Sequence, residues 1–163
     1  MPRTELVVVK ESLEENMSKG FIRQLSSPFA ATVSFAKKAD GGLHFCIDYR
    51  DINSKTIQHR YFLALIRDTL NLLGKPRVYT KIAVHGAYNL LRVKEGDGHR
   101  LAVRTRYGLF EPTVMQFGTT YAPADFQGYI NNAIRQALDD FASAYLDNVL
   151  IYSNSEEEIE GHV

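Results

Sequence analysis

The residues with the clearest capacity for chemistry are an acid and an amide, Asp147 and Asn148, set between two short apolar segments. Aspartate and asparagine are also common in tight turns, so the tetrapeptide Tyr145-Leu146-Asp147-Asn148, taken alone, is explained most simply as a hairpin tip. The five histidines have no zinc-ligand spacing and lack cysteine partners. The sequence contains neither a Gly-x-Ser-x-Gly motif nor a phosphate-binding loop, which leaves this turn as the main candidate site.

The segments around this turn are expected to be two short strands and a helix. The strands cover 143–146 and 149–152, and Asp147-Asn148 forms the turn between them. The helix begins at Pro123, a favoured first helical position, with Asp125 in the first turn, where the helix dipole favours an acid. Its apolar stripe consists of Phe126, Ile130, Ala133, Ile134, Ala137, Leu138 and Phe141. The acidic tail beyond the second strand is either a solvated face or the start of another helix.

The rest of the chain mixes helices and strands without regular alternation, which indicates an α+β domain. Two hairpins are expected, the first with strands 31–38 and 43–50, the second with strands 101–105 and 109–115. The other expected elements are a strand over 78–84 and helices over 10–19 and 64–73, the first helix being capped by Gly20.

Length and composition limit the class of protein. The 163 residues suit one domain or two small subdomains, and 45% hydrophobic residues are enough for a packed core. Lys plus Arg equals Asp plus Glu at 19 each, so any nucleic-acid binding must come from local patches. The one cysteine, Cys46, cannot form an intramolecular disulfide, which favours an intracellular protein, nuclear or cytoplasmic. We find no apolar run long enough for a membrane span.

Several blocks of sequence stand in a fixed order along the chain. They are Lys-Gly-Phe-Ile-Arg (19–23), Ser-Ser-Pro-Phe (26–29), Lys-Lys-Ala-Asp-Gly (37–41), Cys-Ile-Asp-Tyr-Arg-Asp-Ile-Asn (46–53), Arg-Thr-Arg-Tyr-Gly-Leu-Phe-Glu (104–111), Phe-Gly-Thr-Thr-Tyr-Ala-Pro-Ala-Asp-Phe-Gln (117–127) and Tyr-Leu-Asp-Asn-Val-Leu-Ile-Tyr-Ser (145–153). In this order and spacing, the blocks closely resemble reverse transcriptases of gypsy-type LTR retrotransposons (Metaviridae). The resemblance implies an ancestral RNA-directed DNA polymerase.

The same resemblance implies the right-hand polymerase fold. Residues 1–80 would be mainly fingers, with a β-hairpin at about 31–50. Residues 81–163 would be mainly palm, with an antiparallel sheet packed on helices. Complete enzymes of the family continue into a thumb and an RNase H domain, so we expect this chain to end before the thumb.

The family's catalytic residues are three palm aspartates that hold two magnesium ions. At the three matching positions this sequence has Ala83, Asp147 and Asn148, so a single family aspartate remains. Because alanine cannot ligate a metal and asparagine lacks the negative charge, we expect the metal pair to be lost, no tightly bound cofactor, and no polymerase activity. The resemblance places Asp97 in a surface loop, so it is not expected to replace a missing acid.

Other family positions imply nucleotide and template contacts. The nucleotide positions are Lys37, Lys38, His44, Tyr88, Phe117 and Gly118, and Gln127 matches a position near the template grip. His44 replaces an arginine that contacts the triphosphate in the family. The alternatives are a solvated hairpin end for the two lysines and a plain core tyrosine for Tyr88.

Three functions remain open at this stage. The first is a degenerate, catalytically inactive reverse transcriptase domain, and the second is a domesticated non-catalytic module that binds nucleic acid or protein. The third is a residually active RNA-directed DNA polymerase. The expected partners are a weakly bound RNA or DNA template-primer or an unidentified protein, and no membrane.

Overall fold

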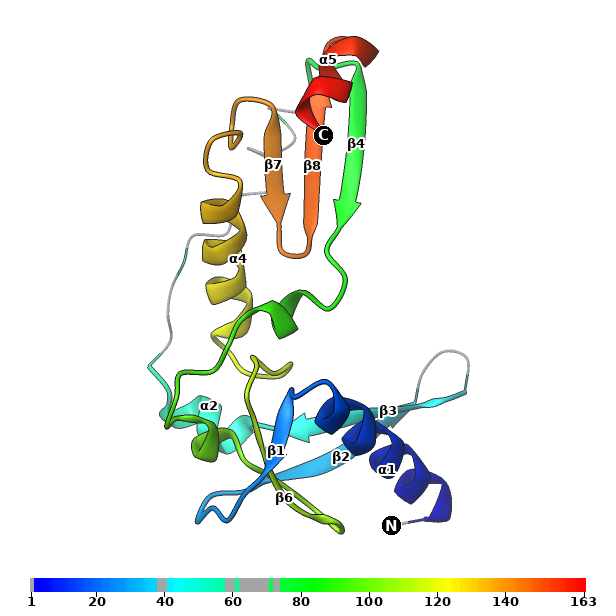
Figure 1. Ribbon diagram of the computed structural model, residues 1–163, viewed down its shortest axis with the longest axis vertical. Helices are drawn as coiled ribbons and strands as arrows, with labels where there is room; N and C mark the ends of the chain where they lie inside the picture. Colours follow the sequence, from blue (N-terminus) through cyan, green and yellow to red (C-terminus); the bar gives the residue numbers. More distant parts are fainter. Residues whose placement is uncertain (1, 38–40, 58–60, 62–70, 72–73) are drawn as a thin grey trace. The chain divides into compact units, whose positions relative to one another are not determined.

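The described part of the chain divides into two compact units. The computed structural model (Figure 1) describes residues 2–37, 41–57, 61, 71 and 74–163. The first unit comprises Met1–Ile57 and Tyr88–Ala122, and the second comprises Gln58–Ala87 and Pro123–Val163. The segment after Tyr88 returns to pair with strands of the first unit. The expected boundary between fingers and palm near residue 80 stays a prediction.

Helix α1 (Arg3–Ser18) begins seven residues earlier than the helix expected over 10–19. Its buried residues, Val9 and Leu13, lie one turn apart and face the sheet of the first unit. The predicted cap is confirmed: Gly20 has φ +67°, its N–H donates to Met17 O, and the Phe21 N–H donates to Asn16 O. These are the bonds of a Schellman motif, which ends the helix.

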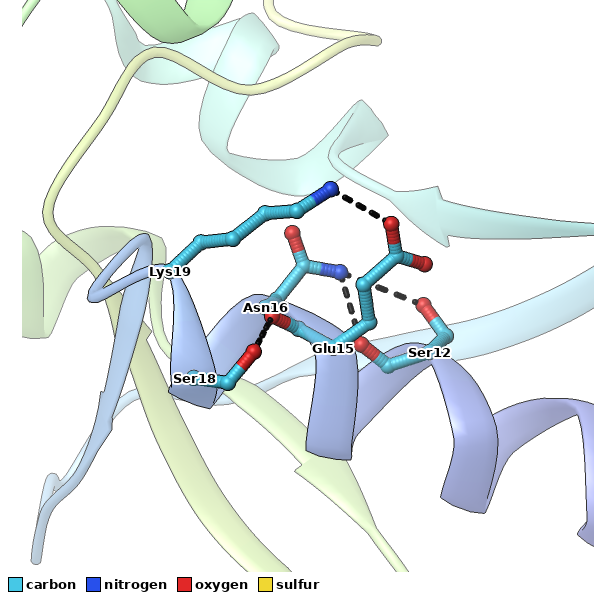
Figure 2. A network of polar contacts seen from close by, with 5 residues as sticks. All are labelled: Ser12, Glu15, Asn16, Ser18 and Lys19. Carbon is cyan, nitrogen blue, oxygen red and sulfur yellow. Dashed lines mark hydrogen bonds and ion pairs between the residues drawn. The ribbon is translucent and has the colours of Figure 1, made fainter.

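Figure 2 shows the polar contacts on the last turns of α1. Lys19 Nζ lies 2.5 Å from Glu15 Oε1, and Asn16 Nδ2 donates to Ser12 O at 2.7 Å. Ser18 Oγ donates to Glu15 O at 2.8 Å. These contacts satisfy polar groups at the helix end, and their exposure limits their contribution to stability.

The first unit contains a five-stranded mixed sheet in the order β1-β6-β5-β2-β3. Its strands are β1 (Ile22–Gln24), β2 (Ala31–Lys37), β3 (Leu43–Asp48), β5 (Val103–Thr105) and β6 (Gly108–Pro112). Both expected hairpins are confirmed, β2 with β3 and β5 with β6, although their strands are shorter than predicted. Strands β2 and β5 pair in parallel, which joins the two hairpins into one sheet.

Two hydrophobic clusters hold the first unit together. One joins Val9 and Leu13 to Phe110, and the other joins Tyr49, Leu101 and Val103. The unit also contains short helices: α2 (Arg50–Lys55), η1 (Ala87–Leu90) and η2 (Gly98–Leu101). Ala87, the first residue of η1, is still counted with the segment 58–87 of the second unit. The sequence did not predict them as helices, because segments of four to six residues show too little periodicity.

The second unit contains an antiparallel sheet in the order β4-β8-β7 (Figure 1). Its strands are β4 (Val78–Ala83), β7 (Ala142–Tyr145) and β8 (Asn148–Ser153), accompanied by helices α4 (Ala122–Ala133) and α5 (Glu156–His162). The acidic tail is confirmed as a helix start, with Ser155 as the N-cap residue.

Two expectations for the second unit are corrected. Helix α4 ends at Ala133, so the last part of the apolar stripe lies in a turn segment and not in the helix. The turn of the last hairpin is Leu146-Asp147, one residue earlier than predicted, and Asn148 is the first residue of β8. The helix expected over 64–73 lies outside the described residues, apart from residue 71.

The described helices include none with the length and apolar character required to cross a bilayer.

Candidate active site

The register of the second sheet brings together the three positions that the resemblance assigns to the family's aspartates; the assignment itself stays a prediction. Ala83, the last residue of β4, is the Cα partner of Asn148, the first residue of β8. The Val84 N–H donates to Asp147 O at 2.7 Å, so the chain after β4 runs beside the hairpin turn. Ala83, Asp147 and Asn148 therefore lie at the same end of one sheet, as the sequence comparison requires.

The turn that carries Asp147 has an unusual backbone. Leu146 adopts φ +51°, a left-handed conformation that non-glycine residues rarely take. The Asp147 side chain is exposed, and its Oδ1 accepts a hydrogen bond from Asn148 Nδ2 at 2.9 Å. The lone carboxylate is thus paired with the neutral amide that stands where the family has its second turn aspartate.

Gln127 fixes this turn from helix α4. Its side chain is 1% exposed, and Oε1 accepts from the Leu146 N–H at 2.8 Å. Its Nε2 donates to Ala144 O at 3.0 Å and to Asn131 Oδ1 at 2.8 Å. In the described sheet β7 is an edge strand, and Gln127 supplies the hydrogen bond that the Ala144 carbonyl accepts on this edge. This positioning contact was not visible in the sequence, which suggested a place near the template grip; that role stays a prediction.

The residues at this end of the sheet do not fit a pair of magnesium ions. Magnesium prefers carboxylate oxygens, and two adjacent ions need several negative charges around them. The site offers one carboxylate, from Asp147, together with the methyl group of Ala83 and the neutral amide of Asn148. Among the described residues, no group of three or more His, Cys, Asp or Glu side chains could hold a metal ion.

A second group of predicted site residues lies in the first unit. The rings of Tyr88 and Phe117 contact each other, with centroids 4.7 Å apart and an interplanar angle of 45°. Phe117 is 70% exposed, and the adjacent Gly118 has φ +93°. Tyr88 is thus half-buried beside the exposed ring of Phe117, and its nucleotide role stays a prediction.

Asn53 holds the loop that presents this pair. Its Nδ2 donates to Gly118 O at 2.7 Å, and its Oδ1 accepts from the Thr120 N–H at 3.0 Å. Asn53 belongs to one of the family blocks, but the sequence did not assign it a role, because its partners are more than 60 residues away. Only its residue type, which offers both a donor and an acceptor, gave a signal.

The hairpin of β2 and β3 carries the remaining predicted nucleotide contacts. Lys37 is exposed at the end of β2. His44 lies in β3 opposite Ala36, and Lys38 lies outside the described residues. The aspartate positions and the nucleotide positions thus belong to different compact units.

The family now follows from comparison with known proteins. A family profile described as "Reverse transcriptase (RNA-dependent DNA polymerase)" matches residues 36–163, most of the chain. The chain belongs to the reverse transcriptase family. The resemblance to gypsy-type retrotransposon reverse transcriptases, inferred from the sequence blocks, is confirmed by the relatives it matches.

Transposon polyproteins of fission yeast are among those relatives. The Transposon Tf2-7 polyprotein of Schizosaccharomyces pombe (strain 972 / ATCC 24843) is 34% identical over 163 residues, which are 100% of this chain and 12% of the polyprotein. The Transposon Tf2-3 polyprotein of the same organism gives the same values. The reverse transcriptase chain therefore spans about an eighth of the length of the curated relatives it matches.

Solved structures confirm the reverse transcriptase fold. A foamy viral protease-reverse transcriptase in complex with double-stranded DNA has a TM-score of 0.83 at 13% identity, covering 99% of this chain and 28% of that chain. The same type of protein in complex with an RNA/DNA hybrid has a TM-score of 0.80 at 13% identity, covering 99% of this chain and 22% of that chain. The α+β right-hand polymerase fold predicted from the sequence is thus confirmed.

Proposed function

We propose that this reverse transcriptase domain has lost DNA polymerase activity. The observation that carries the proposal is the register between β4 and β8, which sets Ala83 opposite Asn148 beside the single carboxylate of Asp147. An ancestral RNA-directed DNA polymerase would hold three carboxylates at this end of the sheet.

Electrostatics supports the loss. Two divalent ions about 4 Å apart repel each other by roughly 17 kcal/mol at an effective dielectric constant of about 20. Three carboxylates offset that repulsion, whereas one carboxylate leaves most of it in place. Since the loss of a single preorganised electrostatic group often lowers the rate about a hundredfold or more, the loss of two carboxylates removes measurable polymerisation.

We infer further that the domain retains affinity for nucleic acid. The fold is that of proteins solved with double-stranded DNA and with an RNA/DNA hybrid, and the exposed ring of Phe117, beside the half-buried Tyr88, offers aromatic surface. Single bases stack on such surfaces regardless of sequence. Because the net charge is zero, this binding is expected to be weak. Because it depends on cations that contact phosphates, the affinity is expected to fall as the salt concentration rises.

Primer extension tests the loss of activity. Because the chain covers 12% of the Tf2-7 polyprotein, it is placed there in exchange for the aligned segment, and incorporation is measured with Mg²⁺ and with Mn²⁺. We expect no templated incorporation from this exchange and a gain when Ala83→Asp and Asn148→Asp are introduced together. Templated incorporation by the unmodified chain that disappears with Asp147→Ala would refute the proposal.

A protein-binding role is the alternative to nucleic-acid binding. It predicts saturable binding of a protein that is insensitive to salt and to Asp147→Ala. Salt-dependent binding of nucleic acid, unchanged by Asp147→Ala, supports the nucleic-acid role.

A further inference from the structure

An exposed aromatic residue outside the family's catalytic positions stands beside a histidine in the first unit. Phe29 is 55% exposed, and its ring centroid lies 6.0 Å from that of His99, with an interplanar angle of 39°. Single exposed hydrophobic residues are common and need no function. Phe29 differs from that ordinary case in how firmly its surroundings are held.

Hydrogen bonds tie the two backbone segments together. Ser27 Oγ donates to His99 O at 2.9 Å and accepts from the Phe29 N–H at 3.1 Å. The Ala31 N–H donates to Ala102 O at 2.7 Å. Both segments are thus fixed on either side of the ring pair, so little conformational entropy is lost when a ligand covers the phenyl ring.

The orientation of the imidazole is also fixed. His99 Nδ1 lies 2.7 Å from Gly96 O, and since a carbonyl oxygen only accepts, Nδ1 carries the proton. In the neutral ring, Nε2 is then left as an acceptor, which suits the amino or imino groups of a nucleobase.

We propose that Phe29 and His99 form a stacking platform for an unpaired base of single-stranded nucleic acid. This inference rests on the retained nucleic-acid binding proposed above. Aromatic side chains stack on every base, because every base has a π face, and the strand's phosphates then need a nearby cation. Arg100, the residue after His99, has a side chain that is 65% exposed and can reach a phosphate.

The carboxylate of Asp97 lowers the affinity that this platform can have for a phosphate. Arg100 Nη1 lies 3.6 Å from Asp97 Oδ1, so the carboxylate partly cancels the cation. Asp97 precedes helix η2, but its side chain makes no capping hydrogen bond. Asp97→Asn is therefore expected to strengthen binding of any phosphate backbone at little cost to the fold.

Fluorescence anisotropy with three labelled probes tests the platform: a deoxythymidine oligonucleotide, an abasic strand of the same length, and a blunt duplex of the same length. Phe29→Leu keeps an apolar side chain and removes the π face, and Phe29→Trp keeps the π face. Since stacking on an aromatic side chain contributes about 1–3 kcal/mol per base, Phe29→Leu should lower the affinity for the deoxythymidine oligonucleotide at least about fivefold. We expect Phe29→Trp to bind this oligonucleotide with the affinity of the parent. Both variants should bind the abasic strand with the affinity of the parent.

The outcomes separate the platform from the function on which it rests. Suppose that the parent binds the probes but Phe29→Leu leaves the affinity for the oligonucleotide unchanged, or lowers the affinity for the abasic strand by the same factor. The platform is then wrong and nucleic-acid binding stands. If the parent binds none of the probes, retained nucleic-acid binding fails and the platform fails with it. Asp97→Asn should tighten all three probes at low salt, and thermal unfolding should be unchanged in Phe29→Leu because the side chain is largely exposed.

Discussion

Replacing Gln127 by leucine should destabilise the second unit, because this one side chain holds two backbone groups of a hairpin. The side chain is 1% exposed and bonds to two backbone groups of the hairpin that carries Asp147. Leucine has a similar volume, so the change removes the hydrogen bonds without opening a large cavity. The Leu146 N–H and the Ala144 carbonyl then lose their partner.

The magnitude follows from the burial of these two groups. An unsatisfied buried donor or acceptor costs about 1–3 kcal/mol, and Leu146 is half-buried, so water can reach its N–H in part. With about 1–3 kcal/mol for the Ala144 carbonyl and about 1 kcal/mol for the partly hydrated Leu146 N–H, the free energy of unfolding should fall by about 2–4 kcal/mol. Asn131→Ala is the matched control. It removes the bond from Gln127 Nε2 to Asn131 Oδ1 and an exposed bond from Asn131 Nδ2 to Tyr61 Oη, keeps both bonds from Gln127 to the hairpin, and should cost below about 1 kcal/mol.

Urea unfolding measures both values, and amide hydrogen exchange gives a local readout. In Gln127→Leu, the Leu146 amide should exchange much faster than in the parent, because its acceptor is gone and its φ of +51° is no longer held. A loss of less than about 1 kcal/mol, or equal losses in Gln127→Leu and Asn131→Ala, would show that Gln127 does not position the turn.

Two further predictions concern the first unit. The Arg50 side chain donates two hydrogen bonds to Asp48, at 2.6 and 2.9 Å, and this contact lowers the pKa of Asp48 from 3.8 to about 2. Its stabilising contribution is therefore present above about pH 4 and is lost as the pH falls towards 2. Arg50→Gln removes the guanidinium but keeps the backbone N–H of residue 50, which also donates to Asp48 Oδ1, so NMR titration of Asp48 should give a pKa between about 2 and 3.8. An unchanged low pKa would contradict the side-chain contact. Tyr49 is 2% exposed, burial raises the pKa of its hydroxyl, and this hydroxyl donates to Leu101 O at 3.0 Å. Tyr49→Phe should cost about 1–2 kcal/mol by urea unfolding, whereas Tyr107→Phe, which removes an exposed hydroxyl, should cost less than about 0.5 kcal/mol; equal losses would contradict this account.

Local sequence signals predicted the elements whose ends depend on local chemistry. The cap at Gly20 and the two hairpins of the first unit were predicted because glycine and short polar turns act within a few residues. The start of α1 at Arg3 was missed, because the run Val7-Val8-Val9 favours a strand and only packing of Val9 on the sheet makes it helical.

The features that could not be predicted from the sequence depend on contacts between distant residues. Asp147 and Asn148 are both good turn formers, yet the turn is Leu146-Asp147, because Gln127, about twenty residues earlier, holds the Leu146 N–H. Ala83 lies opposite Asn148 in the sheet, and the match of both residues to the family's aspartate positions stays a prediction. The hydrogen bond from Asn148 to Asp147 and the clamp made by Asn53 appear only in the structure.

Manganese binding tests most directly whether one carboxylate can hold the metal pair. Isothermal titration of Mn²⁺ would compare the unmodified chain, Ala83→Asp with Asn148→Asp, and the same double variant carrying Asp147→Ala. We predict saturable binding by the double variant, loss of that binding on adding Asp147→Ala, and no saturable binding by the unmodified chain. Two Mn²⁺ ions bound by the unmodified chain, and lost with Asp147→Ala, would contradict the account.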